Sequence, residues 1–98
     1  MNEYDERQLK LMLKKIQLFN EDHKYFSDLI YDLEALMNVL TVQDQSWNEI
    51  FQGYWWDLEQ VYACALDDEK LFLDSEDQII INDALKNLKK IIEDRLNQ

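Results

Sequence analysis

Apolar residues recur at the spacing of an amphipathic helix in four stretches of this chain. A spacing of three and four residues places side chains on one face of a helix. The stripes begin at Leu9, Phe26, Trp47 and Ile81, and polar residues fill the positions between their members. The pattern therefore predicts helices over about residues 4–20, 26–41, 46–67 and 75–96.

Two short sequences indicate where the third and fourth helices start. Ser46 precedes Glu49 by three residues, the spacing of a capping box, in which the serine oxygen accepts from a backbone amide and the acid reaches back. Ser75 and Gln78 form a second sequence of this kind, with carboxylates near a helix N-terminus, where the helix dipole favours them. Both sequences predict N-caps at the serines.

Four such helices with short connections favour antiparallel neighbours. The chain of 98 residues has one glycine, Gly53, and no proline. It therefore lacks nearly all of the glycine and proline residues that the tight turns of an ordinary β-sandwich require. We therefore expect an all-α fold, a single four-helix bundle of up-down topology or a close variant, over residues 1–98. No stretch has the length and hydropathy of a signal peptide or a membrane span, and a lone cysteine fits a reducing compartment, so we expect a cytoplasmic protein.

The net charge of −11 is concentrated in the middle of the chain. Residues 44–83 contain 11 acidic residues and a single lysine, whereas residues 84–98 have a net charge of +2. Such a field repels phosphate backbones and anionic lipid, and it steers basic proteins toward the surface. We therefore expect a basic protein as partner, with no direct nucleic-acid binding and no membrane binding.

The side chains that carry most enzyme chemistry are scarce. The only histidine, His23, lies in a charged connection, and one histidine cannot build a di-iron bundle site. The acidic runs at residues 67–69 and 74–77 lack the ligand spacing and the glycine of a calcium loop, and they are interpreted as helix ends. Cys64 has no neighbouring base and is interpreted as inert packing. These patterns predict a protein without catalytic residues, cofactor or metal.

Two aromatic residues are expected to point away from the core. With Phe51 as the core direction, Trp56 projects at about 140° and its neighbour Trp55 at about 40°. A projection from Leu33 turns Tyr31 outward by about 160°. Aromatic anchors among carboxylates are typical of a tight interface with a basic partner. The candidate partner-binding residues are Tyr31, Glu49, Gln52, Trp56, Glu59, Gln60, Asp67 and Asp68.

Two features stay open to more than one interpretation. Tyr4, Leu11 and Leu18 recur every seven residues on the first helix, as a wide core face or as a dimer seam. We favour the core, because three residues make a short coiled coil, and we therefore expect a monomer. Gly53, on the polar side of the third helix, either admits a partner backbone beside Trp56 or is simply tolerated.

Several segments resemble the small all-helical immunity proteins of bacterial contact-dependent growth inhibition systems. The resemblance covers most of residues 28–92 and consists largely of core aromatics and leucines. It is carried by the segments 32–36, 55–63 and 80–85 together with Leu40, Trp47 and Phe51, and the segments read Asp-Leu-Glu-Ala-Leu, Trp-Trp-Asp-Leu-Glu-Gln-Val-Tyr-Ala and Ile-Ile-Asn-Asp-Ala-Leu. The chain departs from colicin immunity proteins, because it has no proline for their tyrosine-pair sequence.

This resemblance implies a cytosolic antidote that binds a sibling toxin domain, often a basic nuclease, and blocks its active site or its nucleic acid. We accordingly expect an immunity protein that occludes a cognate toxin with the carboxylates of the third helix and of the 67–77 connection, anchored by Trp56. The alternative is a helical adaptor or scaffold that dimerises through the first helix.

Overall fold

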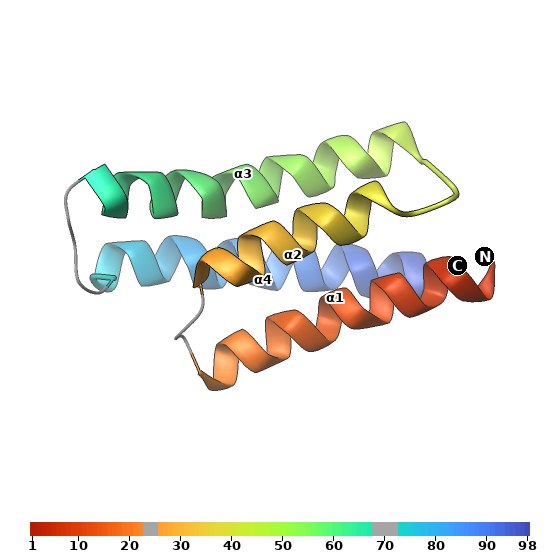
Figure 1. The fold of residues 1–98 in the computed structure, drawn as a ribbon, viewed down its shortest axis with the longest axis horizontal. Coiled ribbons are helices and arrows are strands. Elements are labelled where there is room, and N and C mark those ends of the chain that lie inside the picture. Colours follow the sequence, from red (N-terminus) through yellow and green to blue (C-terminus); the bar gives the residue numbers. More distant parts are fainter. Residues whose placement is uncertain (23–25, 68–72) are drawn as a thin grey trace.

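The chain folds into four antiparallel helices that run up, down, up and down (Figure 1). The computed structural model describes residues 1–22, 26–67 and 73–98. The helices are α1 (Glu3–Glu21), α2 (Phe26–Asn38), α3 (Gln45–Asp67) and α4 (Ser75–Leu96). Each packs against its neighbours in sequence, and α4 returns to α1, so that the N- and C-termini lie at the same end (Figure 1). The expected all-α four-helix bundle is confirmed.

All four helices contribute to one core of apolar side chains, as the periodicity predicts. Leu9, Leu33, Phe51 and Leu88, one from each helix, are completely buried. Rings pack across the helices as well as along them, because Phe26 of α2 meets Tyr62 of α3 edge to face at 6.1 Å between ring centroids. None of the described helices combines the length and apolar content that crossing a membrane requires.

The predicted N-caps of α3 and α4 are displaced by two residues and by one residue. Asp44, not Ser46, caps α3, because its Oδ1 accepts from the backbone N of Trp47 at 3.1 Å. Glu49 instead accepts from the Gln45 side chain, one turn earlier. For α4 the capping box is formed by Asp74 and Asp77, and Ser75 is the first helical residue. In both cases an aspartate just upstream of the serine takes the role, since its carboxylate is an equally good or better acceptor.

The second helix ends at Asn38 rather than at the expected Thr41. The helix does not continue to Thr41 because a distant carboxylate, that of Asp5, binds the amides of Thr41 and Val42. Asp5 Oδ1 accepts from the backbone N of Thr41 at 2.8 Å and from its hydroxyl at 2.9 Å, and Oδ2 accepts from the backbone N of Val42 at 2.9 Å. Leu40 still reaches the core, from a turn instead of a helix.

Asp5 is the centre of a polar network that joins α1, α4 and the α2–α3 connection. It is 1% exposed. Burial alone would raise the pKa of this carboxyl, but the hydrogen bonds from Thr41 and Val42, with the charge of Arg95, lower its pKa below the ordinary value. Arg95 donates from Nη2 to the Val42 carbonyl at 2.6 Å and lies over the Trp47 ring, 4.4 Å from its centroid. The network thereby fixes one end of the bundle.

The stripe on the first helix does not belong to the core. Tyr4, Leu11 and Leu18 are 40%, 38% and 49% exposed. The core interpretation of this stripe is therefore wrong. The narrower set of Leu9, Met12, Ile16 and Phe19 already fills the contact of α1 with its neighbours, and the outer stripe is left at the surface.

Candidate functional site

An open groove of about 580 Å³ lies between α2 and α3. We call it the α2/α3 groove. Met37, Phe51 and Trp55 contribute apolar surface, while Glu34 and Asn38 line it from α2 and Gln52, Gly53 and Trp56 line it from α3. An apolar surface with a few polar groups placed around it is typical of a recognition site.

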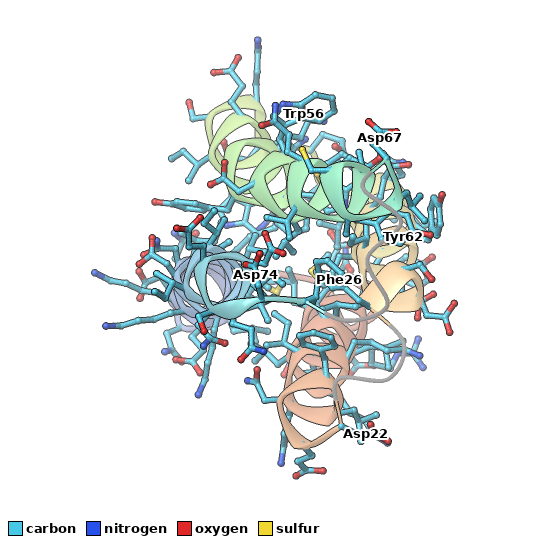
Figure 2. The ribbon with its side chains drawn as sticks, turned by 90° about the vertical axis from the view of Figure 1, so that its left-hand side faces the viewer. Asp22, Phe26, Trp56, Tyr62, Asp67 and Asp74 are labelled. Carbon is cyan, nitrogen blue, oxygen red and sulfur yellow. The ribbon has the colours of Figure 1, made fainter. Side chains whose placement is uncertain are left out.

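The two adjacent tryptophans have different environments. Trp55 is half-buried between α2 and α3, and its Nε1 donates to the Ile30 carbonyl at 2.8 Å. Trp56 is 53% exposed and projects from the outer side of α3 (Figure 2). The predicted outward direction of Trp56 is confirmed, whereas Trp55 is less deeply buried than a core position implies. The most deeply buried of the three tryptophans is Trp47, which is 9% exposed and whose Nε1 donates to the Ile91 carbonyl.

The structure brings only some of the predicted partner-binding residues to the groove. Gln52 and Trp56 line it directly, and Glu49 precedes Gln52 by one turn. Tyr31 is 60% exposed and lies on α2 one turn before Glu34. These four residues flank one surface.

The remaining candidates continue along α3 toward its C-terminal end. Gln60 and Asp67 are exposed, and Asp67 lies about 16 Å along the helix from Trp56, given a rise of about 1.5 Å per residue. Glu59 is half-buried rather than exposed. Asp68 lies outside the described residues, as do His23 and the rest of residues 68–72 in the 67–77 connection. The candidates therefore form an elongated face, with the groove at one end.

The second and third helices carry negative charge without any counter-charge of their own. Residues 26–67 contain eight acidic residues and no lysine, arginine or histidine. Asp32 pairs with Lys15 of α1 at 3.3 Å, and Asp44 caps α3. The other six make no ion pair with any residue in the described ranges. Asp28 lines a pocket beside α1 and Asp57 lines one beside α4, so these two acids face elsewhere. We call the groove with Tyr31, Glu34, Glu49, Trp56 and Glu59 the acidic α2/α3 face, whose field attracts cations from a distance.

Gly53 opens the groove and has no packing role within the bundle. A Cβ atom built at this position would meet nothing within 4 Å. Glycine in a helix interior is less stable than alanine by about 1 kcal/mol. The bundle therefore carries this cost without any internal contact that requires it.

Replacing Gly53 with alanine should stabilise the isolated protein. We expect Gly53→Ala to raise the free energy of unfolding by about 1 kcal/mol, because the methyl group enters open space and the unfolded chain loses freedom. Chemical denaturation of the two proteins measures this difference. A lower stability of the variant would show that the glycine serves the fold itself.

Sequence reasoning missed two residues of the groove, Glu34 and Asn38. Both follow Tyr31 at helical spacing, by three and seven residues, so the signal was present on the face of α2 that Tyr31 marks. Cys64 was misinterpreted as packing. It is exposed, and it lines a second groove between α3 and α4 together with Asp57, Ile80 and Asp83.

The described residues contain no group of three or more histidine, cysteine, aspartate or glutamate side chains placed to hold a metal ion. Comparisons of the chain with protein-family models, with curated proteins and with solved structures gave no match. The acidic α2/α3 face is therefore the feature of the described chain from which we infer a function.

Proposed function

We propose that this protein is an immunity protein, which binds and neutralises a basic toxin domain through its acidic α2/α3 face. The observation that carries the proposal is the combination of exposed aromatic residues, an open groove and the carboxylates Glu34, Glu49 and Glu59 on α2 and α3, which make no ion pair in the described ranges. Exposed tryptophan and tyrosine side chains are frequent anchors in protein interfaces, and the surrounding charge supplies steering. The resemblance to immunity proteins of growth inhibition systems supports the same function.

The mechanism in this proposal is occlusion. A nuclease or other enzyme of nucleic acids holds phosphates with lysine and arginine side chains. Carboxylates presented on a rigid helix can occupy those cations, and Trp56 excludes water at the centre of the contact. No bond is made or broken, and the protein acts in the cytoplasm of the cell that it protects.

Co-expression of this chain with the products of its neighbouring genes, among which we expect a basic toxin domain, tests the proposal. We expect a strain that produces the toxin domain to grow only when the immunity protein is also produced. Protection should be lost when Glu34, Glu49 and Glu59 are replaced together by lysine, because the reversed charges repel the basic partner. Replacing three exposed acids of α4, Glu76, Asp83 and Asp94, is the matched control. Equal loss of protection in both variants would contradict a role for the acidic α2/α3 face.

A helical adaptor that dimerises through α1 is the second candidate. The exposure of Tyr4, Leu11 and Leu18 favours it, since a stripe with a seven-residue repeat can form a seam between two copies. The charged residues beside the stripe disfavour such a dimer. Arg7 and Lys15 would meet like charges when two copies pair antiparallel about Leu11, and like pairs destabilise such seams.

The isolated protein is therefore expected to sediment as a monomer at micromolar concentration. Sedimentation velocity at low and at physiological salt measures the state. A dimer that Leu11→Glu or Leu18→Glu dissociates without loss of helical content would support the adaptor function instead.

A further inference from the structure

We infer that the α2/α3 groove is an arginine-binding site, which receives a guanidinium group from the protein partner. The inference rests on the proposed function for the origin of the arginine, and it adds the chemical class that the groove selects. Four polar groups line the groove, and none of them makes a hydrogen bond or ion pair with a described residue. They are the Glu34 carboxylate, the Asn38 and Gln52 amides and the Trp56 indole.

These groups match what a guanidinium group requires. Its planar fork donates two parallel hydrogen bonds to a carboxylate, and its flat face stacks on an aromatic ring. Glu34 is half-buried, so a contact there is screened less by water than one at a fully exposed acid. Asn38 and Gln52 offer additional carbonyl acceptors. Gly53, between Gln52 and Trp56 in the lining, has no side chain to narrow the entrance.

Within the described ranges, no lysine or arginine of the chain itself pairs with Glu34. No basic residue lies between residues 26 and 67, which include both helices of the groove. The charge of the groove is therefore uncompensated from within these helices, and its complement is a positively charged side chain.

The same chemistry occurs in the interior of this bundle. Arg95 lies over the Trp47 ring at 4.4 Å from the centroid, and the nearby charge of Arg95 helps to lower the pKa of Asp5. That buried arrangement combines an indole, a guanidinium and a carboxylate. Trp56 and Glu34 provide the indole and the carboxylate again at the surface, without the guanidinium.

Titration with two peptides of equal length and charge tests the inference on the isolated protein. One peptide alternates arginine with glycine, and the other alternates lysine with glycine. The readout is the NMR signal of the Trp56 indole N–H, assigned by its absence in Trp56→Phe. We expect the arginine peptide to bind on the order of fivefold more tightly than the lysine peptide, because guanidinium groups stack on indole and pair bidentately.

Two variants with the same change of charge locate the site. Glu34→Gln should abolish the preference for arginine, whereas Glu49→Gln, on the same face but outside the lining, should weaken both peptides equally and preserve it. Trp56→Leu should also abolish the preference, detected then from the backbone amides of Gly53 and Asn38. This second variant keeps the test valid if Glu34→Gln fails to fold.

Equal affinity of both peptides for the wild-type protein would overturn the inference, as would a preference that survives Glu34→Gln and Trp56→Leu. Shifts confined to the α3/α4 groove, around Cys64 and Ile80, would also overturn it. None of these three results bears on the protection of cells in co-expression, so the proposed function would still be judged by its own test. If the arginine preference is observed but the protein gives no protection in co-expression, the immunity function is rejected and the arginine-binding site is retained.

Discussion

Trp56→Ala should weaken binding of the cognate toxin domain by about 2 kcal/mol or more, a loss of about 30-fold, as truncation of an interface anchor does. The same change should lower the free energy of unfolding by less than about 1 kcal/mol, because the side chain is largely outside the core. Its neighbour behaves in the opposite way. Trp55→Ala should cost about 3 kcal/mol of stability, since it removes a half-buried ring and leaves the Ile30 carbonyl without its indole donor.

Ile50 supplies the control for this pair. It also lies on α3 and is 50% exposed, close to the 53% of Trp56, but it is not part of the groove lining. Ile50→Ala should leave both binding and stability nearly unchanged. Chemical denaturation and binding titration of the three variants separate the two roles. If Trp56→Ala binds as well as the wild-type protein, the partner surface is elsewhere on the bundle.

Asp5→Asn should destabilise the protein by about 3 kcal/mol at neutral pH. The carboxylate accepts three hydrogen bonds from Thr41 and Val42, and an asparagine amide would turn a donor toward one of these donors. Loss of hydrogen bonds to a charged, buried group costs about 1.5–3 kcal/mol each before relaxation. The exposed acid Glu3, in the first turn of the same helix, provides the control, because Glu3→Gln changes the charge equally but breaks no such network.

The effect of Asp5 should also depend on pH. Its pKa is lowered in the folded state, so its stabilisation is fully present above the ordinary carboxyl pKa of about 4 and is lost as the pH falls through the folded value. The stability difference between the wild-type protein and Asp5→Asn should therefore be constant near neutral pH and shrink below about pH 4. Denaturation at a series of pH values measures this difference. A difference that stays constant down to pH 2 would contradict the assigned hydrogen bonds.

The parts of this fold that sequence predicts are those set by local periodicity. The predicted bounds of the last helix, 75–96, agree with the structure, because its apolar stripe is regular and an acidic cap precedes it. The end of α2 could not be predicted in the same way. Leu40 continues the stripe, and the helix stops because Asp5, 36 residues earlier, takes the amides of Thr41 and Val42.

The candidate site shows the same division. The outward direction of Trp56 follows from its angular position on α3 alone. The outward direction of Tyr31 follows in the same way from its position on α2. The groove is a property of two helices together, since Glu34 and Asn38 face Gln52 and Gly53 only after α2 and α3 pack. Tyr4, Leu11 and Leu18 are regularly spaced, but the spacing does not show how much of the surface of α1 the neighbouring helices bury.

The most direct test of the proposed interface is an NMR map of the protein in complex with the toxin domain that it protects against in co-expression. Backbone amide signals of the free and bound protein are compared residue by residue. We expect changes to concentrate in residues 31–38 of α2 and 49–60 of α3, with the change at the Trp56 indole among the largest. Changes confined to α1 or to residues 86–96 of α4 would contradict it.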